Sequence, residues 1–202
     1  MTTVYLLRHS EPLKVNNIEN SDSLQLQNEK WGLTINGENI AKEKSKNSEL
    51  QDFDIVFSSN YVRAIATAKY FTNDKINVVE SFGERKFGID NWNELPDDFS
   101  KKQYEDFDYK FSNGESLNMV INREYEALNN ILNNYKDKKV LIVGHSTAIA
   151  SLLTKWCDVD FMGDYKFNNE VFFDGKWNYC ECFRLEFDDN NKIISIDNIK
   201  FD

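Results

Sequence analysis

The sequence of 202 residues contains few cysteines and few histidines, and both shortages limit its chemistry. The three cysteines, Cys157, Cys180 and Cys182, cannot all pair within one chain, and no secretory signal is evident, so we expect reduced thiols and a cytoplasmic location. The only histidines are His9 and His145. Together these residues lack the second ligand pair of a zinc site, and the sequence therefore predicts no bound metal and no other cofactor.

Long apolar runs and a basic charge balance are also missing. No stretch approaches the roughly 20 residues that a membrane-spanning helix needs, so we expect no membrane span. Acidic residues number 34 against 24 basic ones, a formal charge of -10 that would repel nucleic acid and anionic membranes. We expect neither as a partner, and an anionic substrate would need a local basic pocket. Nothing in the sequence indicates the oligomeric state.

Short apolar runs alternate with helical patterns along the chain. The runs predict buried strands at 4–7, 53–57, 76–79 and 139–143, and two further strands are expected at 177–187 and 192–199. Helices are expected at about 33–50, 62–71, 117–135 and 146–156, with Ser58 to Asn60 capping the second and a capping box at 112–115 opening the third. Segment 11–31 is a polar stretch, and segment 81–96 is predicted to be a loop. The pattern predicts one α/β domain, residues 1–202, folded as a three-layer αβα sandwich with a mostly parallel central sheet.

Charged and polar side chains follow the ends of four predicted strands. Arg8 and His9 follow the first strand, and Arg63 begins the helix after the second. Glu84 lies in the loop after the third strand, and His145 follows the fourth. Because the carboxyl ends of parallel strands meet at one edge of a sheet, we expect these five side chains to gather there.

These residue types suit phosphoryl transfer. A neutral imidazole can act as nucleophile, two guanidinium groups can bind phosphate oxygens, and a second imidazole can donate a further hydrogen bond. The helix that begins after His145 adds backbone amide donors and a favourable dipole for an anion. A carboxyl group such as that of Glu84 can donate a proton to the leaving oxygen.

Four segments carry these residues in recognisable motifs. Residues 6–11 read LLRHSE, residues 53–68 read FDIVFSSNYVRAIATA, residues 82–88 read FGERKFG, and residues 140–146 read VLIVGHS. They resemble, in order, the Arg-His-Gly opening, the Ser-Ser-x-x-x-Arg-Ala-x-x-Thr-Ala segment, the Glu-containing loop and the second-histidine stretch of the histidine phosphatases, or phosphoglycerate-mutase-like superfamily. The matched elements run from about residue 3 to residue 156.

The resemblance implies a metal-independent phosphatase that acts on a small phosphorylated molecule. It implies that His9 becomes phosphorylated, that Arg8, Arg63 and His145 hold the phosphoryl group, and that Glu84 protonates the leaving group and then activates water. The chain departs from the family pattern at two places. Ser10 replaces the glycine after the first histidine, and Gly144-His145-Ser146 replaces Ser-His-Gly around the second.

Other residues near these motifs have two interpretations each. The family often has an asparagine shortly after the nucleophile, and Asn16 or Asn17 can fill that place, although the spacing does not align cleanly. Arg85 either contacts the substrate or is a solvated surface charge. Four aromatic residues can line a substrate pocket, but packing in the core is the favoured interpretation for them: Phe82, Phe87, Trp92 and Phe99.

Three alternative functions use the same residues. A serine hydrolase with Ser146 as nucleophile needs a base histidine later in the chain, and none follows His145. A phosphomutase of the same fold would keep the phosphoenzyme, but the chain looks shorter than family mutases and lacks their longer active-site insertions. A non-catalytic phosphate-binding module would lack a nucleophile or an acid, and neither is missing here.

Overall fold

A central six-stranded sheet organises the computed structural model, which describes residues 1–15 and 23–201. The strand order is β3-β2-β4-β1-β8-β9, and the first four of these strands are parallel. β8 runs antiparallel to β1, and β9 antiparallel to β8. The strands are β1 (Thr2–Arg8), β2 (Ile55–Ser58), β3 (Ile76–Val78), β4 (Lys139–Gly144), β8 (Cys182–Phe187) and β9 (Ile193–Asn198). The predicted mostly parallel sheet is confirmed.

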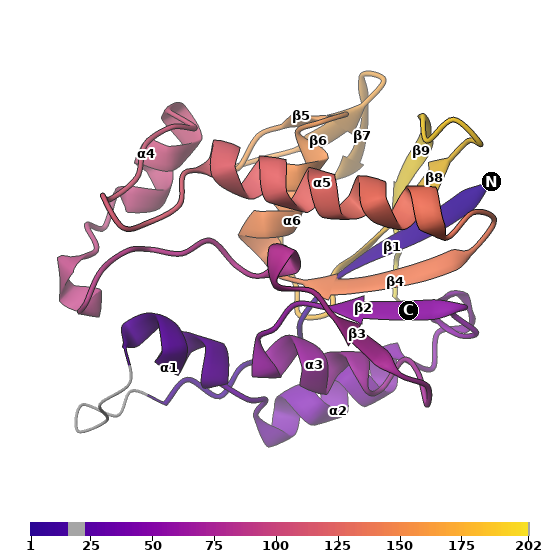
Figure 1. Ribbon diagram of the computed structural model, residues 1–202, viewed down its shortest axis with the longest axis horizontal. Coiled ribbons are helices and arrows are strands. Elements are labelled where there is room, and N and C mark those ends of the chain that lie inside the picture. The colour runs from indigo at the N-terminus through magenta and orange to yellow at the C-terminus, as the bar shows by residue number, and fades with distance from the viewer. Residues whose placement is uncertain (16–22, 202) are drawn as a thin grey trace.

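Helices cover both faces of this sheet, which confirms the three-layer prediction (Figure 1). One face carries α5 and α6, and the other carries α2 and α3. The helices are α1 (Leu24–Lys30), α2 (Ile35–Lys44), α3 (Val62–Ala68), α4 (Phe99–Glu105), α5 (Leu117–Asn134) and α6 (Ser146–Leu153). Single 3-10 turns lie at η1 (Ser48–Leu50), η2 (Glu80–Phe82) and η3 (Trp92–Glu94). No helix of the described residues is long and apolar enough to cross a membrane.

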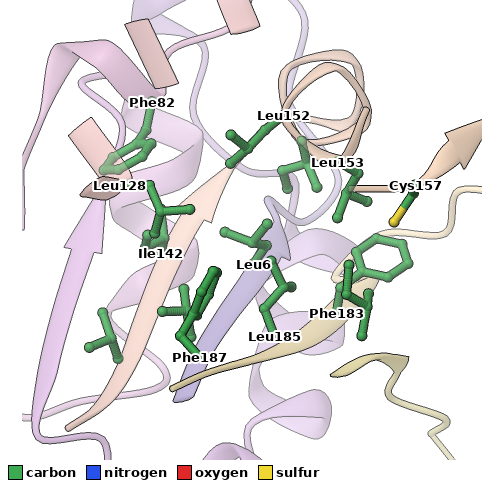
Figure 2. Packing of buried hydrophobic residues seen from close by; sticks show 14 of the residues in the cluster. Leu6, Phe82, Leu128, Ile142, Leu152, Leu153, Cys157, Phe183, Leu185 and Phe187 are labelled. Carbon is green, nitrogen blue, oxygen red and sulfur yellow. The ribbon is translucent and has the colours of Figure 1, made fainter. Parts of the chain in front are cut away.

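Alternation along β1 divides the apolar side chains between two cores. Val4 and Leu6 face the core under α5 and α6, whereas Tyr5 and Leu7 face the core under α2 and α3. Figure 2 shows Leu6 beside Ile142 of β4, with side chains of α5 and α6 closing over them. A strand buried on both faces needs a continuous apolar run, which explains why β1 and β4 were recognisable from sequence.

The register between neighbouring strands places the two histidines side by side. Arg8 of β1 pairs with Gly144 of β4, and the backbone N–H of His9 donates to the Gly144 carbonyl at 2.9 Å. On the other side of β4, the N–H of Ser59 donates to the Val143 carbonyl at 2.9 Å. The chain therefore leaves β1, β2 and β4 at the same edge and at the same level.

Several local predictions are wrong in detail. The polar stretch 11–31 contains α1, whose first turn is capped by the side chain of Ser23, and α4 follows the expected loop. α3 begins after Tyr61 with no side-chain cap, and the Ser59 hydroxyl contacts His145 instead. α5 is capped by the side chain of Ser116, so no capping box forms at 112–115. The helix expected at 33–50 is divided into α2 and η1, and the one expected at 146–156 ends at Leu153.

The C-terminal region also differs from expectation. Strand β8 begins only at Cys182, because residues 177–181 turn back toward Arg8. A small second sheet of β5 (Asp158–Val159), β6 (Tyr165–Phe167) and β7 (Glu170–Phe173) was not predicted. Cys157, Cys180 and Cys182 are buried and free, and burial raises the pKa of Cys157 to about 12.

A carboxyl group interrupts the buried face of α5. Glu124 is 2% exposed and lies in the same stripe as Val120, Ile121 and Leu128. Its Oε2 has no hydrogen-bond partner among the described residues. Burial is the main cause that raises the pKa of Glu124 from 4.5 to about 8, and the neighbouring carboxyls of Glu84 and Glu115 add to the rise.

Replacing this buried acid changes how stability depends on pH. Between pH 4.5 and about 8 the folded chain holds a proton on Glu124 that the unfolded chain releases, so stability falls as pH rises. The slope reaches up to ~1.4 kcal/mol per pH unit. Glu124→Gln removes this slope, and its advantage over the wild type should grow with pH. Urea denaturation at several pH values tests this, with the exposed Glu126→Gln on the same helix as control. Parallel curves of stability against pH for the wild type and Glu124→Gln would contradict the prediction.

Candidate active site

A cavity of about 420 Å³ opens at the carboxyl ends of β1, β2 and β4. Four of the five predicted side chains line it: Arg8, His9, Arg63 and Glu84. The fifth, His145, is fully buried, and its ring makes an edge contact with that of His9, with 5.0 Å between the centroids. The structure therefore brings together all five residues that the strand ends predicted.

His9 is held as a neutral imidazole. Its Nδ1 lies 2.6 Å from the carbonyl oxygen of Ser10, which can only accept, so Nδ1 carries the proton. Its Nε2 accepts a hydrogen bond from Nε of Arg63 at 3.1 Å and therefore carries the lone pair. Burial, followed by the charge of Arg63, lowers the pKa of His9 well below 6.5. The free lone pair of a neutral ring is what a nucleophile requires.

His145 lies behind His9 and is also neutral. Burial is the main cause that lowers its pKa, and His9 and Arg63 lower it further. Its Nδ1 is 3.4 Å from NH2 of Arg63, and its Nε2 is 2.9 Å from the hydroxyl of Ser59. The Ser59 hydroxyl also accepts from the backbone N–H of Tyr61 at 3.3 Å. The sequence predicted a helix cap at Ser59, and the contact of its hydroxyl with His145, 86 residues later in the chain, had no signal in the sequence.

Arg63 connects the parts of this site, and only neutral groups bind it. Besides the two imidazoles, its NH1 donates to the backbone carbonyl of Asn28 at 2.6 Å and to the Asn28 side-chain oxygen at 3.2 Å. The residue is 4% exposed, and within the described ranges it forms no ion pair. Burial lowers its pKa. Asn28 comes from α1, the helix that the sequence pattern did not reveal.

Arg8 is the second cation without a carboxylate bound to it. Its NH1 donates to the carbonyls of Trp177 at 2.9 Å and Asn178 at 3.2 Å, and its guanidinium lies over the Tyr179 ring at 5.0 Å. Its buried Nε has no partner among the described residues, and burial lowers its pKa. Arg63 is buried, Arg8 is partly buried, and the hydrogen-bond partners of both are neutral, so the pair can bind a phosphoryl dianion.

Glu84 reaches the cavity from a loop that α5 holds in place. Arg123 of α5 donates to the carbonyls of Ser81 at 2.7 Å and Glu84 at 3.3 Å. Arg123 is itself fixed by Glu115, with contacts of 2.8 and 3.0 Å. Glu115 also accepts from the backbone N–H of Lys86 at 2.9 Å. This clamp positions the Glu84 backbone while leaving its half-buried carboxyl at the cavity wall.

The two departures from the family motif fit the structure. The Ser10 hydroxyl donates to the Gly37 carbonyl at 2.7 Å, and its backbone N–H donates to the Thr67 hydroxyl at 2.9 Å. The serine therefore bonds to α2 and α3 rather than to a ligand in the cavity. Ser146, the first residue of α6, lines the cavity, so a side chain stands where the family has glycine.

The remaining candidates lie in different places. Arg85 is 6% exposed, and it donates to Gln103 at 3.0 Å and Ser100 at 2.9 Å. The interpretation as a solvated surface charge is therefore wrong, and the structure does not place Arg85 among the residues that line the cavity. Asn16 and Asn17 lie outside the described residues. Of the four aromatic candidates, Phe82 and Phe99 are buried, whereas Phe87 and Trp92 line the cavity.

Acidic and metal-ligating side chains do not gather elsewhere in the described part of the chain. Among residues 1–15 and 23–201, no three His, Cys, Asp or Glu side chains are grouped so as to hold a metal ion.

The cavity also contains residues that the sequence did not mark as site residues, namely Lys14, Asn28, Trp31 and Tyr179. They come from segments that were interpreted as a polar stretch (11–31) or a strand (177–187), and they belong to none of the recognised motifs.

Two neutral histidines lie with the buried Arg63 and the partly buried Arg8 at the carboxyl edge of a mostly parallel sheet, and together they define a site suited to phosphoryl groups. The model of the histidine phosphatase superfamily, branch 1, matches residues 4–195. The chain is 30% identical over 164 residues to the uncharacterized phosphatase PhoE of Bacillus subtilis, and the match covers 77% of each chain. The chain belongs to this superfamily and is a phosphatase of its metal-independent type.

Solved structures share the fold over nearly the whole chain. Bacillus stearothermophilus YhfR matches with a TM-score of 0.70 and 21% identity, covering 96% of this chain and 95% of its own. A mycobacterial glucosyl-3-phosphoglycerate phosphatase in complex with VO3 also has a TM-score of 0.70, at 18% identity and 98% coverage of both chains. Phosphoserine phosphatase from Entamoeba histolytica, in complex with phosphoserine, has a TM-score of 0.65 at 20% identity, covering 98% of this chain and 97% of its own.

Proposed function

We propose that the chain hydrolyses a phosphomonoester through a phosphohistidine formed on His9. The observation that carries this proposal is the pair of guanidiniums of Arg8, partly buried, and Arg63, buried, which face one cavity and hydrogen-bond to neutral partners only. A phosphomonoester dianion matches their combined charge. Its phosphorus would then lie beside the neutral imidazole of His9, whose Nε2 lone pair is free to attack once Arg63 turns its Nε–H to a phosphate oxygen.

The first step forms one bond and breaks another. Nε2 of His9 attacks phosphorus, and the bond from phosphorus to the ester oxygen breaks in line with it. A protonated Glu84 gives its proton to the leaving oxygen, so the products are phospho-His9, a free alcohol and the Glu84 carboxylate. Arg8, Arg63 and the amides at the start of α6 stabilise the charge on the equatorial oxygens.

The second step returns the site to its starting state. The Glu84 carboxylate takes a proton from water, and the oxygen of that water attacks phosphorus and releases His9. Inorganic phosphate leaves, and Glu84 holds a proton again. In both steps His145 can donate to a phosphate oxygen, because the Ser59 hydroxyl can turn from acceptor to donor and allow the His145 proton to move to Nδ1.

Related proteins support hydrolysis of small phosphorylated molecules. Three of the matched proteins bear the names of phosphatases, including one for phosphoserine and one for glucosyl-3-phosphoglycerate. These names favour hydrolysis over the mutase and binding-module alternatives. A cytoplasmic location and the absence of nucleic-acid partners stay predictions from the sequence.

Rapid-quench labelling of His9 tests the proposal. With a phosphomonoester labelled with ³²P, and with EDTA present, the wild type should form an acid-labile, base-stable phosphoenzyme and release phosphate. His9→Ala should take up no label and lose activity by a factor of ~10³ or more, because the substitution removes the imidazole nitrogen that attacks phosphorus. Circular dichroism confirms that the variant folds. A His9→Ala protein with wild-type labelling would contradict the assignment, and label without phosphate release would favour a mutase.

Glu84→Gln tests the acid role through the leaving group. The amide cannot donate a proton to an alkoxide as a carboxylic acid does, so the phosphorylation rate should fall by ~10² or more for benzyl phosphate. It should fall much less for p-nitrophenyl phosphate, whose leaving group needs no proton. Glu80→Gln, an exposed position four residues earlier, serves as control and should keep both rates. Equal losses for the two substrates in the Glu84→Gln enzyme would exclude Glu84 as the acid.

A further inference from the structure

We propose that the natural substrate carries a planar aromatic or heteroaromatic ring near its phosphate, and that this ring packs on Trp31 and Trp92. The inference rests on the proposed function and adds the class of leaving group. It comes from the part of the cavity lining where aromatic side chains from separate segments meet.

Three aromatic side chains form a continuous wall along the cavity. The rings of Trp31 and Trp92 are nearly parallel, at 25° and 6.0 Å between centroids. Phe87 meets Trp92 edge-on at 5.4 Å. The indole N–H of Trp31 already donates to the Val15 carbonyl at 2.9 Å, so Trp31 offers a ligand its apolar ring rather than a hydrogen bond. All three rings are partly exposed and line the cavity, unlike the buried Phe82 and Phe99.

The wall begins beside the phosphate-binding groups. The guanidinium of Arg63 lies 5.9 Å from the centre of the Trp31 ring, and that of Arg8 lies 5.0 Å from the Tyr179 ring. A phosphate bound by both arginines therefore has an aromatic side chain next to each of its cationic contacts. Trp31 and Tyr179 both line the cavity, so the group esterified to that phosphate has aromatic surface within the same pocket.

Polar partners for a polyhydroxylated leaving group are few in the described lining. Both oxygens of Asn28 that face Arg63 are already bonded to it. Glu84 is assigned to proton transfer, which leaves the hydroxyls of Ser146 and Tyr179, the side-chain NH2 of Asn28, the indole N–H of Trp92 and the ammonium of Lys14. Each buried sugar hydroxyl would need a partner of its own, and a missing partner weakens binding.

Charge in the cavity also argues against a second anionic group on the substrate. Arg8 and Arg63 offset the phosphate dianion, and the imidazoles of His9 and His145 are neutral. Among the described lining residues, Lys14 is then the one remaining cation, and it is exposed at the rim. A flat apolar or heteroaromatic ring needs neither further charge nor many hydrogen bonds, and it buries its faces against other rings.

Two matched substrate pairs test the inference. Benzyl phosphate and cyclohexylmethyl phosphate have primary alcohol leaving groups of similar size and differ in planarity. Adenosine 5′-monophosphate and ribose 5-phosphate share the esterified sugar carbon and differ in the base. In each pair we expect kcat/KM to be about three- to tenfold higher for the substrate with the planar aromatic ring, from ring packing of the size seen for aromatic contacts.

Variants of the wall connect that preference to its residues. Trp92→Leu should bring both ratios of kcat/KM close to one. Trp31→Leu should do the same, and because the two residues lie in separate segments, agreement between the variants shows that the effect does not come from a disturbed turn. Phe161→Leu removes a stacked aromatic residue outside the cavity and should keep the wild-type ratios.

The outcomes separate this inference from the proposed function. Equal kcat/KM within both pairs, or ratios that survive Trp92→Leu and Trp31→Leu, would overturn the aromatic-ring proposal while hydrolysis and phospho-His9 persist. No turnover and no label with any of the four substrates would instead overturn the proposed function, and the aromatic-ring proposal with it.

Discussion

The burial of Arg63 among neutral hydrogen-bond partners is the constraint on which the site depends. Its guanidinium bonds to His9, to His145 and to Asn28, which come from the ends of β1 and β4 and from α1. The same charge helps to keep both imidazoles neutral and assigns the lone pair of His9 to Nε2. Together with burial and the Ser10 carbonyl, this side chain keeps the imidazoles neutral and fixes the tautomer of His9.

This arrangement lowers stability in the absence of ligand. A buried cation without a carboxylate costs desolvation energy that neutral acceptors offset only in part. Arg8 adds a second, partly buried cation, whose Nε has no hydrogen-bond partner in the described part of the chain. The two-sided core around β1 and β4 compensates for this cost, because both strands are buried on both faces. A phosphate dianion that binds in the site supplies negative charge beside these cations and so offsets their desolvation cost.

The features predicted from sequence are those with a local signature. Buried parallel strands leave short apolar runs, and the residues that follow them mark the edge of the sheet, so Arg8, His9 and His145 could be assigned together. The contributions of Asn28, Ser59 and Trp31 could not, because each depends on a contact with a residue distant in sequence. α1 is short and polar. The pattern at 177–181 predicted a strand, whereas the carbonyls of Trp177 and Asn178 accept hydrogen bonds from Arg8.

The aromatic residues show the same limit, because core packing and ligand binding both favour aromatic side chains, and the sequence of 82–99 does not distinguish the two. Phe82 and Phe99 turn inward, whereas Phe87 and Trp92 line the cavity.

The most direct test of this account is the ¹⁵N spectrum of the imidazoles as pH is lowered from neutral to mildly acidic values. The chain has two histidines, so the signals can be assigned with one substitution. The account predicts that both rings stay neutral well below pH 6.5 and that His9 carries its proton on Nδ1. Titration of either ring with its ordinary pKa near 6.5, or a proton on Nε2 of His9, would contradict it.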